Sequence, residues 1–193
     1  MELPLYELFI DEEDESGVDF IALVDDPAIK KGWQTFNNVR EMTFKADKEK
    51  RIISGAAMIA NLPIYRRRKD GSEYYVMFKP DTIKSIVEKF FRNQYSNNFN
   101  MMHKKNLLAE GVYLIESMII DKERGIRTPM GFDELSEGSW FISCKVDNDK
   151  VWEDYIKTGV FSGFSVEGEF IEKKISHANK QLDEILEILN QVK

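Results

Sequence analysis

Residues 158–170 restrict the architecture of this chain more than any other segment. After a short helical pattern, large apolar residues resume on both sides of Ser165, with glycines at positions 159, 163 and 168. This pattern predicts one strand. A strand fixes the direction of a serine side chain, and glycines let a substrate backbone come close. The segment therefore suits a nucleophile, although a serine in a glycine-containing strand is more often structural.

The motif around Ser165 is Gly-x-Ser-x-x-Gly. It differs from the Gly-x-Ser-x-Gly elbow of the α/β hydrolases, because no strand-to-helix turn follows it. A serine nucleophile needs a general base, which is usually histidine. The chain has two histidines, and His177 lies in the polar entry to a C-terminal helical pattern, where we expect it to be exposed. His103 is therefore the candidate base.

Short apolar segments separated by turn residues predict further strands. They cover residues 5–10, 18–24, 51–60, 63–66, 74–78, 112–120 and 139–146. Apolar residues at helical spacing after Pro80 predict a helix over 80–91, and a shorter helix is predicted around 151–156. The sequence thus indicates one strand-rich α+β domain over residues 1–174.

Glu116 interrupts the strand predicted at residues 112–120. If side chains alternate between the two faces of the strand, Glu116 lies on the same face as Val112, Leu114, Met118 and Ile120. A buried carboxylate needs a partner. Glu116 is therefore either exposed at an edge or paired with a group such as His103.

The tail, residues 175–193, has a helical pattern of a different kind. Its apolar residues are spaced three and four apart: Ile175, Ala178, Leu182, Ile185, Leu189 and Val192. This spacing is typical of a coiled-coil seam, although it is shorter than three heptads. We expect an amphipathic helix that packs on its own domain or on a partner helix.

Charge and cysteine content exclude several classes of protein. The net charge of −7 argues against a nucleic-acid-binding protein. The basic run at residues 66–69 precedes Asp70-Gly71 and predicts a solvated hairpin turn. The single cysteine, Cys144, fits a core position and a reducing compartment. No apolar window predicts a membrane span, and the first residues lack signal-peptide features, so we expect a cytoplasmic protein. No metal-ligand spacing or nucleotide-binding motif is present, and no cofactor is implied.

Six segments in a fixed order carry a resemblance to a known family. They are residues 18–29, 53–66, 100–103, 110–121, 138–152 and 159–170. Together they resemble the phage prohead (capsid maturation) serine proteases, in particular the XkdF-like type of PBSX-like prophages. The resemblance implies a mostly antiparallel β-barrel with surrounding helices, like the herpesvirus maturation protease (assemblin). It also implies peptide-bond hydrolysis by a serine and a histidine, which correspond to Ser165 and His103.

The third catalytic residue is open at this stage. The herpesvirus enzymes use a second histidine, and the only other one here is His177. A carboxylate would serve instead, because it accepts a hydrogen bond from the imidazole and fixes its tautomer. Our choice is Glu116. Glu167 and Glu169 are rivals, but strand alternation places both on the face of Ser165, and the alternative for Glu167 is a position in the wall of the cleft. Family members often have an acidic residue directly after the histidine, where this chain has Lys104.

The resemblance further implies a setting inside the assembling prohead, in the host cytoplasm. The expected substrates are scaffold protein, extensions of the capsid protein and the protease itself. The expected partners are scaffold and major capsid proteins, and the chain is also expected to self-associate. No binding to nucleic acid or to a membrane is expected. The tail helix, residues 175–193, would contact scaffold. The alternative is a non-enzymatic virion or capsid-assembly protein that retains the fold.

Overall fold

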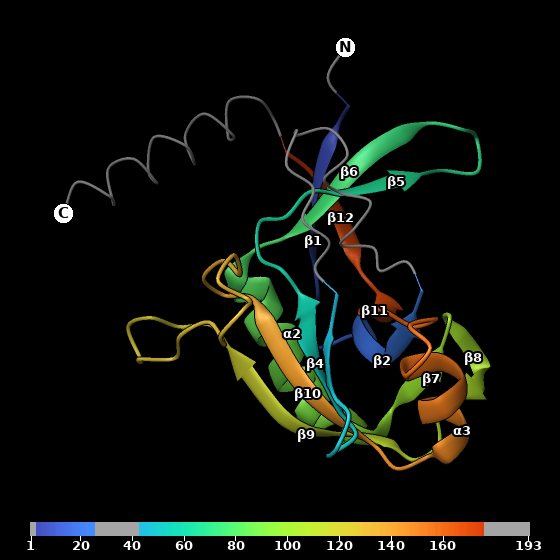
Figure 1. The fold of residues 1–193 in the computed structure, drawn as a ribbon. Coiled ribbons are helices and arrows are strands. Elements are labelled where there is room, and N and C mark those ends of the chain that lie inside the picture. The colour runs from blue at the N-terminus through green and yellow to red at the C-terminus, as the bar shows by residue number, and fades with distance from the viewer. Residues whose placement is uncertain (1–2, 26–42, 176–193) are drawn as a thin grey trace.

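In the computed structural model, which describes residues 3–25 and 43–175, strands form three four-stranded sheets (Figure 1). Sheet A, in the order β12-β1-β6-β5, consists of β1 (Leu5–Phe9), β5 (Ile64–Arg67), β6 (Glu73–Phe78) and β12 (Ile171–Lys174). Sheet B, in the order β11-β2-β7-β8, consists of β2 (Gly17–Val24), β7 (Phe99–Met101), β8 (Lys104–Leu108) and β11 (Gly163–Glu169). Sheet C, in the order β3-β4-β10-β9, consists of β3 (Lys45–Asp47), β4 (Ile52–Met58), β9 (Val112–Ile119) and β10 (Trp140–Val146).

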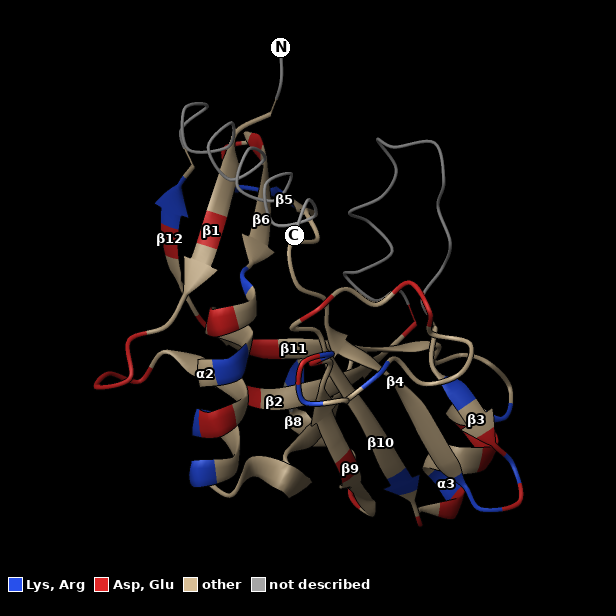
Figure 2. Ribbon diagram, turned by 90° about the vertical axis from the view of Figure 1, so that its left-hand side faces the viewer, with Lys and Arg blue, Asp and Glu red and all other residues tan. Residues whose placement is uncertain are grey.

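The helical elements are few and mostly short. They are α2 (Pro80–Arg92), η1 (Tyr95–Asn97), α3 (Asp149–Val151) and the π-helical turn η2 (Trp152–Ile156). Proline in the first turn suits the start of α2, because the missing N–H group has no helical partner there. Figure 2 shows the charged residues of α2 spaced along its length, with β2 next to the helix. The predicted helix at Pro80 is confirmed.

The apolar face of α2 is narrower than the sequence predicts. Its buried residues are Ile83, Ile86, Val87 and Phe90. Phe90 packs against Trp140 of β10 with ring centroids 5.4 Å apart. The next residue, Phe91, is 42% exposed, because one residue further along a helix turns the side chain by about 100°. The helix therefore anchors β10 through one aromatic contact.

The α+β class with mostly antiparallel strands is confirmed, whereas a closed barrel is not formed. Only the β1–β6 and β2–β7 pairs are parallel. A barrel needs an unbroken ring of paired strands. In the described ranges, each sheet instead ends in two edge strands, and register shifts interrupt the ladders of β10 and β11. Such shifts bend a strand and end regular pairing.

The hairpin of β5 and β6 follows the predicted turn. The carboxylate of Asp70 accepts hydrogen bonds from the N–H group and the hydroxyl of Ser72, at 2.9 and 2.7 Å. Gly71 has a φ of +87°, which a residue without a side chain adopts at low cost. The tail helix predicted from residue 175 onward lies outside the described residues, apart from Ile175. Within the described ranges, no helix is long and apolar enough to cross a membrane.

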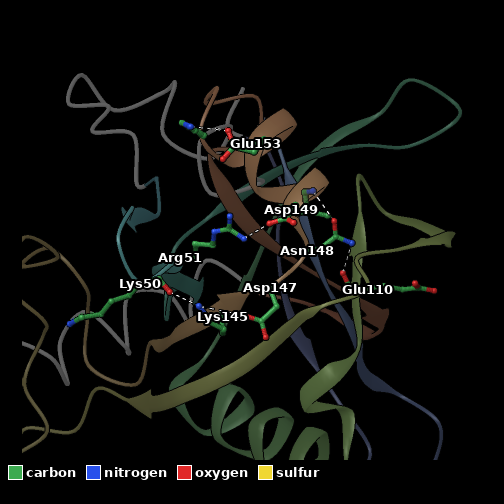
Figure 3. Close-up of polar contacts among 10 residues, drawn as sticks. Lys50, Arg51, Glu110, Lys145, Asp147, Asn148, Asp149 and Glu153 are labelled. Atoms are coloured by element: carbon green, nitrogen blue, oxygen red, sulfur yellow. Dashed lines mark hydrogen bonds and ion pairs between the residues drawn. The ribbon is translucent and has the colours of Figure 1, made fainter.

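A group of polar contacts joins α3 to the neighbouring ends of β4 and β9 in sheet C (Figure 3). Asn148 accepts a hydrogen bond from the Val151 N–H group and donates one to the carbonyl of Glu110, so it caps α3 and ties it to the start of β9. Arg51 forms an ion pair with Asp149. None of these residues lines the cavity described below, and their role is structural.

Gly168 is required by close packing of two strands. An added Cβ atom at this position would lie 1.7 Å from the carbonyl oxygen of Gly17 on β2. Because that neighbour is backbone, the strands would have to separate. We expect Gly168→Ala to lower the free energy of unfolding by about 2 kcal/mol or more. The measurement is urea unfolding, with the exposed Val160→Ala as the control that should change little. Equal stability of the two variants would contradict this packing.

Candidate active site

A cavity of about 310 Å³ is lined by the inner residues of sheet A, by β11, by the end of β4 and by His103. Most of its wall is apolar, including Ile64, Val76 and Phe78 of sheet A. The charged or nucleophilic side chains that line it are Arg66, His103, Ser165, Glu167 and Glu172. An apolar cavity with a few converging polar groups is the usual form of a substrate site.

Ser165 lies in the first half of β11 and is 7% exposed. Its strand neighbour Phe164 is 1% exposed and packs against Phe44, with ring centroids 5.5 Å apart. Burial of Phe164 fixes the rotation of the strand. Alternation then places Ser165 and Glu167 on the same side, and both line the cavity.

His103 lies in a two-residue turn between β7 and β8. Met101 pairs with Lys104, so Met102 and His103 are the two central residues, with φ angles of 56° and 55°. Hairpin turns with positive φ at both positions normally use asparagine and glycine. Larger residues held in this region cost of order 1 kcal/mol each and are found preferentially at functional sites. The Met102 N–H group donates to the carbonyl of Leu23 on β2, at 3.0 Å, which fixes the turn to sheet B.

A buried asparagine connects the histidine turn to β11. The His103 Nδ1 atom lies 3.8 Å from Glu167 Oε2. The same carboxylate oxygen accepts a hydrogen bond of 2.7 Å from Nδ2 of Asn100, which is fully buried. In the sheet B register, Asn100 and Ser165 flank Ala22 on β2. The small side chain of Ala22 leaves room for Glu167 to reach across the sheet.

Local burial sets the charge of the histidine. Burial lowers the pKa of His103 below its ordinary value of 6.5. The Glu167 carboxylate opposes this shift, and the Arg66 guanidinium adds to it. The imidazole keeps 44% of its side-chain surface exposed, so substrate can reach it. His103 is therefore mainly neutral at pH 7, the form that accepts a proton.

The remaining acidic candidates lie elsewhere. Glu116 is exposed on β9 opposite Ser143 of β10 and does not line the cavity. A register shift between Ser143 and Cys144 breaks the strict alternation on which its predicted face depends. Glu169 is exposed beyond the register shift at Gly168 and is likewise outside the cavity lining. Ser165, His103 and Glu167 line one cavity, and Glu116 does not.

Sequence reasoning missed Asn100 and the cavity position of Arg66. Asn100 falls in a segment rich in asparagine, in which the sequence predicts no strand. The short alternation Phe99-Asn100-Met101 is the only local sign of β7. His177 lies outside the part of the chain that the structure describes. Among the residues described, no group of three or more His, Cys, Asp or Glu could hold a metal ion.

Comparison with known proteins identifies one family. A family model described as "Putative phage serine protease XkdF" matches residues 38–173, a range that includes Ser165, His103 and Glu167. The search of curated proteins and the search of solved structures each gave no match. The likeness to the herpesvirus maturation protease therefore stays a prediction.

Proposed function

The chain belongs to the XkdF family of phage serine proteases, and from this premise we propose that it is a serine endopeptidase of phage capsid maturation. The observation that supports the proposal most strongly is the shared cavity. Ser165 of β11 and His103 of the β7–β8 turn both line it, beside an acidic residue that faces the imidazole. A nucleophile, a base and an orienting acid recur in serine peptidases of several unrelated folds.

In the proposed reaction, the Ser165 hydroxyl oxygen attacks the carbonyl carbon of the scissile peptide bond. Nε2 of His103 takes the hydroxyl proton and then gives it to the leaving amine. Water, deprotonated by the same nitrogen, releases the acyl group from Ser165. Backbone N–H groups near Ser165 stabilise the tetrahedral oxyanion.

Glu167 supports the histidine in this scheme. It faces Nδ1 of His103, which leaves Nε2 for the serine. Its carboxylate favours the imidazolium that forms during attack. The 3.8 Å separation exceeds a hydrogen bond, and such contacts often shorten only when substrate binds. The Asn100 amide holds the carboxylate by donating a hydrogen bond to the same oxygen that faces His103.

The pH dependence follows from the environment of His103. As pH rises through the pKa of His103, the imidazole loses its proton and kcat/KM increases. Because burial lowers that pKa, we expect the acidic limb of the profile to lie below pH 6.5. Arg66 contributes to the lowering, so Arg66→Gln should move the limb to higher pH. Arg67→Gln is the control, because Arg67 is the next residue of β5 and does not line the cavity. A limb that stays in place in Arg66→Gln would exclude His103 as the titrating base.

We propose capsid assembly as the setting, and the description of the matched family as a phage serine protease is compatible with it. We propose scaffold protein, extensions of the capsid protein and the chain itself as substrates. The test is co-expression with the scaffold and capsid proteins encoded beside it, comparing wild type, Ser165→Ala and His103→Ala by intact mass. New protein termini should appear with wild type alone. If all three chains join the particle and leave every protein intact, the chain is a structural assembly protein instead.

A further inference from the structure

Three consecutive arginines on the β5–β6 hairpin have three different environments. Arg68 pairs with Glu172 at 2.7 Å and lies 4.2 Å from the centre of the Tyr74 ring. Arg67 donates a hydrogen bond to the carbonyl of Gly71, within the turn. Arg66 alone of the three lines the cavity with Ser165. All three arginines are exposed, as the predicted solvated turn requires, and Arg66 differs from the other two in lining the cavity.

The two carboxylates that line the cavity already have partners. Glu167 accepts a hydrogen bond from Asn100 and faces His103. Glu172 pairs with Arg68 and accepts a second hydrogen bond, of 3.2 Å, from the Tyr74 hydroxyl.

Arg66 has no such partner. Its guanidinium donates to the carbonyl of Tyr65, at 3.2 Å, and no carboxylate of residues 3–25 or 43–175 lies within ion-pair distance. The Arg66 side chain is exposed to solvent at the cavity wall, where partial burial lowers its pKa. Because no counterion from the described residues occupies it, the guanidinium can bind a ligand carboxylate that enters the cavity.

The unpaired charge lies close enough to act on the catalytic step. The Arg66 guanidinium disfavours the charged form of His103. That form develops when the serine is deprotonated. A carboxylate bound to Arg66 would neutralise this effect and make proton transfer easier. An acidic substrate would therefore gain in kcat as well as in binding.

We propose that Arg66 binds the carboxylate of a glutamate or aspartate side chain of the peptide substrate, so that the site selects acidic sequences beside the scissile bond. This inference rests on the proposed peptidase function. A guanidinium suits the role, because its planar donors bind both carboxylate oxygens. Ile64, Val76 and Phe78 line the same cavity and provide an apolar wall for the stem of the side chain.

The test uses two pools of randomised heptapeptides, both acetylated and amidated, with either Glu or Gln fixed at the central position. We expect wild type to cleave the Glu pool about tenfold faster or more, the usual effect of one hydrogen-bonded charge. Arg66→Gln should cleave both pools at the same rate, and Arg67→Gln should keep the wild-type ratio. A wild-type ratio near one, or an unchanged ratio in Arg66→Gln, overturns the inference while leaving the peptidase function intact.

A binding measurement separates this inference from the proposed function. Fluorescence anisotropy of labelled pools with Ser165→Ala should show tighter binding of the Glu pool, and Arg66→Gln in the same background should remove the difference. If the binding difference is found but wild type cleaves neither pool, the proposed peptidase function is refuted and the carboxylate-binding site is supported. Equal binding of the pools to Ser165→Ala overturns the site. A third pool with Gln and a free C-terminus shows whether the terminal carboxylate is the group bound, and preference for that pool over the Glu pool also overturns the inference.

Discussion

Replacing Ser165 by alanine is expected to lower kcat/KM for peptide cleavage at least about 10³-fold while the fold stays intact. The hydroxyl supplies the nucleophile that attacks the peptide bond in the proposed scheme, so only direct attack by water remains in the alanine variant. The side chain is small and makes no structural hydrogen bond that the structure records, so the free energy of unfolding should change by less than about 1 kcal/mol. The measurement is cleavage of the fastest peptide from the randomised pools, with the melting temperature recorded in parallel.

Ser162→Ala is the matched control for Ser165→Ala. The Ser162 hydroxyl donates to the carbonyl of Asp25, at 2.8 Å, and lies outside the cavity lining. Its loss should leave cleavage within about threefold of wild type, a factor that corresponds to less than 1 kcal/mol. If Ser165→Ala keeps more than a tenth of the activity, or if Ser162→Ala loses it, the nucleophile has been wrongly assigned.

Replacing Glu167 by glutamine is expected to lower kcat about 10²-fold or more with little change in KM. The amide keeps the shape of the carboxylate and removes the charge that stabilises the imidazolium of His103. Because Glu167 raises the pKa of His103, the acidic limb of the profile should move to lower pH in Glu167→Gln. A purely structural residue would not move it, so the pH profile distinguishes the two roles.

Glu116→Gln is the control for Glu167→Gln, because Glu116 is the carboxylate that the sequence favoured. Glu116 is exposed on β9 in another sheet, and its substitution should leave kcat and the pH profile unchanged. Loss of activity in Glu116→Gln with wild-type activity in Glu167→Gln would return the orienting role to Glu116. Wild-type activity in both Glu116→Gln and Glu167→Gln would show that His103 needs no acidic partner.

Short apolar runs and one helical pattern explain why much of the fold could be predicted. Most residues of β2, β4 and β10 are buried, as expected for apolar runs bounded by turn residues, and the buried face of α2 begins as expected after Pro80. These segments bury enough apolar surface for local pattern and tertiary packing to agree. The position of Ser165 on a strand follows from the same agreement.

The errors come from features without a local pattern. The register shift beside Cys144 exposes Glu116, and a shift of one residue cannot be read from an apolar run. The turn at Met102 and His103 uses residues that seldom adopt positive φ, so no turn motif identified it. Glu167 and Arg66 belong to different sheets, and only the arrangement of sheets A and B brings them to one cavity, while Asn100 on β7 donates a hydrogen bond to Glu167.

The most direct measurement is mapping the adduct of a fluorophosphonate probe on the intact protein by tandem mass spectrometry. The probe phosphonylates an activated serine with release of fluoride, and so reports the nucleophile without any knowledge of the substrate. The account predicts one phosphonylated residue, Ser165, with labelling lost in His103→Ala. A modified serine other than Ser165, or no adduct on a folded protein, would contradict it.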